Sequence, residues 1–264
     1  MIRQSRDGVV FYQFAALAKY PEIVHAVFTR IGGRSVRPFD TLNVGHAVGD
    51  VKRHVERNHG VVLQTIGLSP RQVVTARQVH GAHVAVVDRT QAGTIVPNTD
   101  ALASNVSGVV LLLRFADCLP IMLYDPRHRA VALAHAGWRG CLSGVVANTM
   151  DELRQSYGTD PTELIACLGP AIGPCCYQVG PDVIAEIEQA FPEYDGLVLA
   201  RANGSVHFDL PGAVRRQLRQ AGVQEIEDSN LCTCCHTGEF FSHRAEGART
   251  GRFVTVLGLN TPQE

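Results

Sequence analysis

Short runs of apolar and β-branched residues recur along this chain and alternate with stretches whose apolar residues return every three or four positions. The alternating stretches predict amphipathic helices that begin near Asp50, Ser143, Pro181 and Asp209. The short runs predict β-strands at Gln72–Ala76, His83–Asp88, Val109–Arg114, Ile121–Tyr124, Ala130–Ala134, Leu164–Leu168 and Arg252–Leu257. Strands and helices mixed along one chain predict an α/β or α+β fold.

The ends of the predicted helices carry recognisable capping residues. Ser143 is a candidate N-cap of the second helix, and Gly158 is its stop. Asp209 precedes the fourth helix and Gly222 follows its last turn. We interpret Asp50 in the same way, as an N-cap and not as a catalytic group.

One pair of strands predicts a β-hairpin. The β-like runs Pro120–Tyr124 and Arg129–Ala134 flank the turn signal Asp125-Pro126-Arg127-His128. Centring the turn on its middle two residues sets Cys118 opposite His135. Directly paired side chains have Cβ atoms about 4.5–5.5 Å apart, close enough for both to bind one ion. A slip of one residue would separate the two faces, and a buried thiol beside an unrelated histidine is the alternative interpretation.

His80 is a candidate third ligand. It follows a strand-like run and precedes Gly81, a residue that lets the chain turn and approach a site closely. The chain has eleven histidines, and taken alone His80 fits an ordinary loop histidine better than a ligand.

Composition narrows the functional class. The chain has 264 residues, with 45% hydrophobic and 19% charged, which predicts one globular domain over residues 1–264. Lys and Arg number 24 against 25 for Asp and Glu, so nothing indicates a nucleic-acid partner. The sequence has no apolar run long enough for a membrane span and no signal-peptide core. We therefore predict a cytoplasmic protein whose eight cysteines are thiols or metal ligands.

Several motifs together resemble those of the YfiH family. These proteins are also called multicopper polyphenol oxidases or laccase-domain proteins, and they are now regarded as enzymes that process purine nucleosides. The matching segments run through nearly the whole chain: Thr29–Gly33, Leu42-Asn43, Val48–Asp50, Gln78–Gly81, Ala116–Pro120, His135–Gly140, Gly169–Tyr177, Phe240–Arg244 and Thr250–Arg252. The resemblance implies a layered sandwich of mixed β-sheets with flanking helices.

The resemblance also implies a metal site and an activity. The family's metal ligands fall on His80, Cys118 and His135. Two nitrogens and one thiolate suit a tetrahedral zinc with an open fourth position, and copper could bind there too. The implied reactions are phosphorolysis of adenosine, inosine, guanosine or S-methyl-5′-thioadenosine and hydrolytic deamination of adenosine. The expected partners are therefore purine nucleosides and phosphate, and the catalytic residues act through the metal.

Cationic and amide side chains near these motifs are candidate substrate contacts. We predict that Arg139, four residues after a ligand, binds an anion or ribose, and that Arg30 and Arg244 come next. Asn43 and Gln78 are the expected hydrogen-bonding partners. No general base can be assigned, because Asp117 adjoins a ligand but neighbours in a strand point to opposite faces.

Other interpretations of the same residues stay open. Cys118 could be a nucleophile with His135 as its base, since the family's fold is similar to that of toxin deamidases. A laccase mechanism is disfavoured, because the chain has no His-X-His pair. A metal-binding protein without catalytic activity ranks last.

The remaining cysteines form two notable motifs. Cys232-Thr-Cys-Cys235-His236 matches the attachment pattern for c-type haem, which export would normally accompany. With Cys175 and Cys176 the same residues could form a second metal site, although packed reduced thiols are the simpler interpretation.

Overall fold

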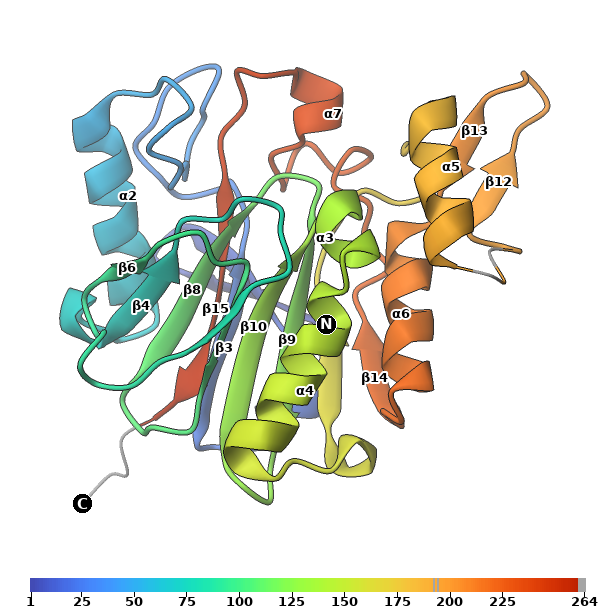
Figure 1. Cartoon of the computed structure of the whole chain (residues 1–264). Coiled ribbons are helices and arrows are strands. Elements are labelled where there is room, and N and C mark those ends of the chain that lie inside the picture. Colours follow the sequence, from blue (N-terminus) through green and yellow to red (C-terminus); the bar gives the residue numbers. More distant parts are fainter. Residues whose placement is uncertain (192, 194, 261–264) are drawn as a thin grey trace.

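Two large β-sheets lie face to face, and helices cover their outer faces (Figure 1). The computed structural model describes residues 1–191, 193 and 195–260. The seven-stranded sheet has the order β1 (Ile2–Arg6), β2 (Val9–Gln13), β3 (Ile23–Phe28), β15 (Phe253–Leu259), β8 (Val110–Phe115), β4 (Val73–Ala76) and β6 (Ile95–Val96). The six-stranded sheet has the order β14 (Glu225–Asp228), β11 (Ile165–Leu168), β9 (Leu119–Asp125), β10 (Ala130–Ala136), β7 (Ala101–Ser104) and β5 (Val84–Val86). The layered sandwich of mixed sheets that the sequence implied is confirmed.

The central strands are apolar on both faces because each face packs against another layer. In β9, Ile121 and Leu123 point to the helical side, whereas Met122 and Tyr124 point into the space between the sheets. Leu111 in β8 faces them from the other sheet. The alternation of side chains along a strand therefore divides each run between two cores.

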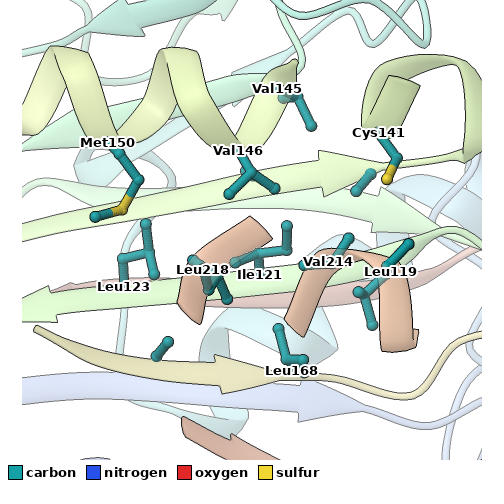
Figure 2. Packing of buried hydrophobic residues seen from close by; sticks show 14 of the residues in the cluster. Leu119, Ile121, Leu123, Cys141, Val145, Val146, Met150, Leu168, Val214 and Leu218 are labelled. Carbon is teal, nitrogen blue, oxygen red and sulfur yellow. The ribbon is translucent and has the colours of Figure 1, made fainter. Parts of the chain in front are cut away.

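Helices α4 (Val145–Tyr157) and α6 (Leu210–Gln220) cover the six-stranded sheet, together with the short α3 (Trp138–Leu142). Helix α5 (Pro181–Ala190) contacts α3 and lies beside β12 and β13 at the upper end of this layer (Figure 1). Figure 2 shows Val146 and Met150 of α4 and Val214 of α6 packed on Ile121 and Leu123 of β9. Their spacing of three and four residues places each apolar stripe on the sheet.

Helix α2 (Lys52–Thr65) covers the opposite face, where Val62 and Leu63 pack on Leu112 and Val256 of the seven-stranded sheet. The remaining elements are short: α1 (Ala15–Ala18), the pair β12 (Val198–Ala200) and β13 (Val206–Phe208), and α7 (His243–Glu246). The order of layers is therefore helix, sheet, sheet, helix.

All seven predicted strands are present, with ends shifted by a few residues. The four predicted helices are present as well, and Asp209 caps α6 by accepting from the N–H of Gly212. Gly158 ends α4 in the left-handed region at φ 72°. Gly222 follows α6 with φ 101°, where glycine alone is unstrained.

Two predicted caps are wrong. Ser143 ends α3, and α4 starts one residue later than expected after Gly144, whose φ of 88° turns the chain between the two helices. Asp50 is not the N-cap of α2, since that position belongs to Val51. The Asp50 carboxylate instead accepts hydrogen bonds from Ser35 Oγ and Asn43 Nδ2, so it binds the preceding loop.

The hairpin β9–β10 is confirmed, but its predicted register is wrong by two residues. His135 pairs with Pro120 instead of Cys118, because the turn lies one residue further along than the middle of the Asp125–His128 segment. A shift by an even number preserves the face on which each side chain lies. Cys118 and His135 therefore still share the inner face, as diagonal neighbours.

The two sheets share one buried core, to which strands β8, β15, β9, β10 and β11 all contribute. A shared core fits the prediction of a single domain over residues 1–264, which stays a prediction. Residues 192, 194 and 261–264 of that range lie outside the described residues. Within the described part of the chain, no helix is both long and apolar enough to span a bilayer.

Candidate active site

The predicted ligands come from three chain segments that end at the same edge of the sandwich. His80 follows the end of β4, Cys118 precedes β9, and His135 lies near the end of β10. Strand β8 runs parallel to β4, and β9 runs antiparallel to β10, so these four ends meet. The topology thus brings together residues that lie up to about 55 positions apart in the sequence.

The three side chains form a compact set of donors. The ligand atoms of His80, Cys118 and His135 all lie within 4.8 Å of one another. The two imidazole rings meet edge to face, with centroids 4.9 Å apart. A Cβ on Gly137 would come within 3.0 Å of Cys118 Sγ and 3.2 Å of His80 Cδ2, so glycine leaves room for this approach. Two nitrogens and one thiolate with a free side fit a zinc ion of the catalytic type.

Asp100, which the sequence analysis missed, orients two of the three ligands. Its Oδ1 lies 2.9 Å from His135 Nδ1, which leaves Nε2 of that ring for a metal. The same carboxylate accepts hydrogen bonds from the N–H groups of Val79, His80 and Gly81. A fully buried carboxylate therefore fixes both the His135 ring and the loop that carries His80.

Two ligand segments have unusual backbone conformations. His80 has φ 61° and Asp117 has φ 88°, a region that favours glycine and costs about 1–3 kcal/mol for other residues. Asp117 is held there by two hydrogen bonds, which its carboxylate accepts from Thr233 Oγ1 at 2.6 Å and from the Arg244 N–H at 2.7 Å. The Asp117 carboxylate thus pairs with a backbone N–H group of the Arg244 segment, and these contacts fix the position of the next residue, Cys118.

Cys118 and His135 stabilise each other's charged forms. Burial disfavours both charges, but the imidazole lowers the pKa of Cys118 to about 6. Burial likewise opposes a charged His135, yet the thiolate and Asp100 raise its pKa to about 9. Between these values the pair holds a thiolate and an imidazolium.

The pKa values predict how zinc affinity depends on pH. A zinc ion at these donors would need the thiolate of Cys118 and the neutral ring of His135. Below about pH 9 zinc must displace the proton of His135, and below about pH 6 it must displace a second proton from Cys118. The affinity should therefore fall with decreasing pH, and more steeply below about 6 than above it. Competition with a chromophoric chelator across this range would measure the slope, and an affinity independent of pH would contradict the assignment.

The three ligands lie in a cleft of about 900 Å³. Its walls include the aromatic side chains Trp138 and Tyr177. Five arginines also line it: Arg77, Arg114, Arg139, Arg244 and Arg252. The chain as a whole has a formal net charge of −1, so this cleft concentrates positive charge that the composition does not reveal.

Three of the predicted substrate contacts line this cleft. The Arg139 guanidinium lies 4.2 Å from the centroid of the Trp138 ring. Arg244 donates from Nη1 to the carbonyls of Cys176 and Gln178 and lies 5.2 Å from the Tyr177 ring centroid. Gln78 also lines the cleft, but its amide exchanges two hydrogen bonds with the backbone of Arg114.

The structure does not bring Asn43 and Arg30 to the cleft lining. Asn43 is fully buried, where its amide bonds Gly45, Asp50 and the N–H of Arg252. Arg30 pairs with Glu246 at 2.7 Å and stacks on Phe241 in a separate, smaller pocket. Both residues hold loops beside the cleft.

Comparison with known proteins gives consistent matches. The family model described as "Multi-copper polyphenol oxidoreductase laccase" matches residues 24–260. The chain is 36% identical over 245 residues to "Purine nucleoside phosphorylase YlmD" of Geobacillus stearothermophilus, with 89% of each chain covered. It is 39% identical over 239 residues to "Purine nucleoside phosphorylase" of Xylella fastidiosa, with 86% of this chain and 88% of that one covered.

Solved structures match the fold closely. The crystal structure of YlmD from Geobacillus stearothermophilus superposes with a TM-score of 0.91 at 33% identity and covers 98% of both chains. The hypothetical protein YfiH of Bacillus licheniformis gives a TM-score of 0.91 at 31% identity, over 98% of this chain and 99% of that one.

Proposed function

The chain belongs to the family described as multi-copper polyphenol oxidoreductase laccase, whose relatives above are named purine nucleoside phosphorylases, and we propose that it cleaves purine nucleosides with phosphate. The observation that carries this proposal is one cleft that joins a His–Cys–His donor set to five arginines. Its volume of about 900 Å³ lies within the range that buries a small-molecule ligand.

The arginines suit a reaction in which phosphate is the attacking group. An oxygen of phosphate forms a bond to C1′ of the ribose while the C1′–N9 bond breaks. The electron pair of that bond leaves with the purine, which takes up a proton, so the products are ribose 1-phosphate and the free base. Guanidinium groups bind phosphate oxygens in a fixed geometry, and their positive charge offsets the negative charge of the phosphate. Arg244 and Arg139 are the proposed contacts, and Trp138 and Tyr177 offer apolar faces to the base.

We propose zinc as the metal, held by His80, Cys118 and His135, with copper as a competitor for the same donors. Zinc at this position would supply a Lewis acid for a substrate or water oxygen. Asp100 holds the ligands in their metal-binding orientation. For adenosine we add hydrolytic deamination, in which water adds at C6, the bond to the exocyclic nitrogen breaks, and ammonia leaves.

Product analysis by mass spectrometry tests the proposal. Zinc-loaded protein is incubated with adenosine, inosine, guanosine or methylthioadenosine, with and without phosphate, beside a chelated control. The expected result is ribose 1-phosphate (or its methylthio analogue) and free base only when phosphate is present, and inosine from adenosine without it. Absence of any phosphate-dependent product from all four nucleosides would overturn the assignment.

Arg139→Ala is expected to weaken phosphorolysis by about tenfold, since one exposed charged contact is worth on the order of 1.4 kcal/mol. The loss should appear as a higher KM for phosphate, because phosphate carries the charge that this side chain binds. Deamination of adenosine uses no phosphate and should change less. Arg154→Ala, an exposed arginine paired with Asp151 on α4, is the control, and equal losses in both reactions would argue against the anion role.

A Cys–His hydrolase is the second candidate, and the lowered pKa of Cys118 beside His135 favours it. A bound zinc would block the nucleophilic thiolate, so chelation should activate such a hydrolase. In a zinc enzyme chelation removes activity and added zinc restores it. The direction of the change upon chelation therefore separates the two candidates.

A laccase reaction has less support from the site. The described residues contain two groups of three or more His, Cys, Asp or Glu side chains with metal-binding geometry, and neither holds more than two histidines. Multicopper oxidases bind their trinuclear cluster through many histidines. Copper at the His–Cys–His donors would therefore give a mononuclear site.

A further inference from the structure

A second group of metal donors lies outside the catalytic ligands. Cys175, Cys176, Cys232 and Cys235 come from two loops, yet all four sulfur atoms lie within 4.8 Å of one another. All four are free thiols. Cys232 is buried, Cys176 is half-buried, and Cys175 and Cys235 are exposed. Four clustered thiols are the donor set of closed structural zinc sites.

The spacing of the sulfur atoms suits a tetrahedral ion. Cys235 Sγ lies 3.5 Å from Cys175 Sγ and 3.4 Å from Cys176 Sγ. Four sulfurs at about 2.3 Å from zinc lie about 3.8 Å from one another. The observed distances are far longer than a disulfide bond of about 2.05 Å. Small movements of the two loops would therefore complete a four-sulfur shell.

Backbone contacts hold the two loops together. Ala171 and Cys232 form a parallel β-bridge, and the N–H of Thr233 donates to the carbonyl of Ala171 at 3.0 Å. The N–H of Gly173 donates to Cys232 Sγ at 3.2 Å. The Cys232–Cys235 segment forms a turn in which the N–H of Cys235 bonds the carbonyl of Cys232. This hydrogen bond holds the turn in one conformation, with its two thiols near the other loop. Metal binding would therefore cost little conformational entropy in this segment.

Charge around the cluster also suits four thiolates. A divalent cation with four thiolates is a dianionic unit. The Arg201 guanidinium donates to the carbonyl of Pro174 at 2.8 Å, and that of Arg244 donates to the carbonyl of Cys176 at 3.1 Å. One cationic group therefore bonds the residue next to Cys175, and the other bonds Cys176 itself.

We propose that Cys175, Cys176, Cys232 and Cys235 bind a second zinc ion in a closed four-sulfur site with a structural role. A closed shell leaves no position for substrate, in contrast to the His–Cys–His donors. The C-x-x-C-H segment is then a zinc-binding turn instead of a haem attachment site.

The second zinc would brace one wall of the cleft. Tyr177 and Gln178, which line the cleft, directly follow Cys176. Thr233, next to Cys232, donates to Asp117, whose neighbour Cys118 is a catalytic ligand. The site therefore connects two loops that position the substrate wall and one metal ligand.

Zinc content per chain tests this proposal in the full-length protein. The expected values are two zinc ions for the unaltered chain, one for Cys118→Ala, one for Cys175→Ser/Cys235→Ser, and none for the combined variant. X-ray absorption of the Cys118→Ala protein should show four sulfur ligands at about 2.3 Å. The melting temperature of Cys118→Ala should fall by more than about 5 °C when a strong chelator removes the remaining zinc.

Cys234→Ser is the matched control, because Cys234 lies in the same turn but outside the set of four, and it should keep two zinc ions. No zinc in Cys118→Ala, or a nitrogen-containing shell in that variant, would overturn the proposal. A Cys175–Cys235 disulfide in freshly purified protein, seen as the loss of two hydrogens by mass spectrometry, would overturn it too. Zinc content does not depend on phosphorolysis, so a failure of the proposed function leaves this test intact.

Discussion

Cys118→Ala is expected to abolish phosphorolysis and deamination, with a loss of about 10³-fold or more in kcat/KM. A bound metal contributes several kcal/mol of charge stabilisation in the transition state, and each 1.36 kcal/mol corresponds to a factor of ten. The thiolate is the single anionic ligand of the set, so its removal takes away the strongest donor for zinc. The measurement is steady-state kinetics with a zinc determination on the same sample.

Folding must survive the substitution for this result to bear on the site. Cys118 lies at the rim of the core between the sheets, just before β9, so a smaller side chain there should leave the sandwich intact. Cys167→Ala is the control, since it removes a fully buried thiol from the middle of β11. That variant should lose some stability but keep its zinc and its activity. A Cys118→Ala protein with full turnover would exclude the His–Cys–His assignment.

Hydrophobic pattern predicted most of the buried inner strands, but it missed the buried inner strands β3 and β7 as well as strands at the sheet edges. Strands β8, β9, β10, β11 and β15 lie between two apolar layers and read as continuous apolar runs. Strand β1, by contrast, is exposed along its whole length and carries few apolar residues, so no run marks it. Strand β14 is not marked by an apolar run either, because its residues are exposed or half-buried. Pairing with a neighbour, and not local composition, makes these segments strands.

Two of the three proposed metal donors, Cys118 and His135, could be paired from the sequence because a hairpin places residues by counting, whereas His80 was assigned from the family resemblance. The predicted register was wrong by two residues, but this error did not change the prediction that Cys118 and His135 lie on the same face of the sheet. Asp100 had no such signal. It precedes β7 in Thr99-Asp100-Ala101, a segment without a motif, and reaches the site because the N-terminal end of β7 lies beside the C-terminal end of β10.

The arginines show the converse limit. Arg114 is the last residue but one of β8, and Arg252 directly precedes β15. Both line the cleft because β8 and β15 are neighbours in the sheet. Arg30 belonged to a motif that matched the family, yet its guanidinium pairs with Glu246 outside the cleft. Motif membership thus marks residues that build the loops as well as residues that face the substrate.

Asp100→Asn is expected to weaken zinc binding by about 10- to 100-fold, the usual effect of losing an outer partner of a histidine ligand. The carboxylate now accepts from His135 Nδ1 and from the N–H groups of Val79, His80 and Gly81. The side chain of Asn has one oxygen that accepts hydrogen bonds and an NH₂ group that only donates. In the Asp100→Asn protein this NH₂ group would face other donors, so those donors would have no acceptor. His135 would lose the contact at Nδ1 that leaves Nε2 for the proposed zinc, and the His80 loop would lose the hydrogen bonds that hold it. Activity should therefore fall at limiting zinc and recover at high zinc.

Asp125→Asn is the matched control for this prediction. Asp125 lies at the turn of the β9–β10 hairpin, at the end away from His135. Its Oδ2 lies 2.8 Å from His128 Nδ1, and its Oδ1 accepts from the N–H groups of Arg127 and His128. Both carboxylates thus bind an imidazole and backbone N–H groups from a buried position. Both substitutions should lower the stability by similar amounts, because each leaves buried donors unpaired. Only Asp100→Asn should lower the zinc affinity, measured by competition with a chelator. An equal loss of affinity in both variants would mean that Asp100 acts through general stability and not by orienting His80 and His135.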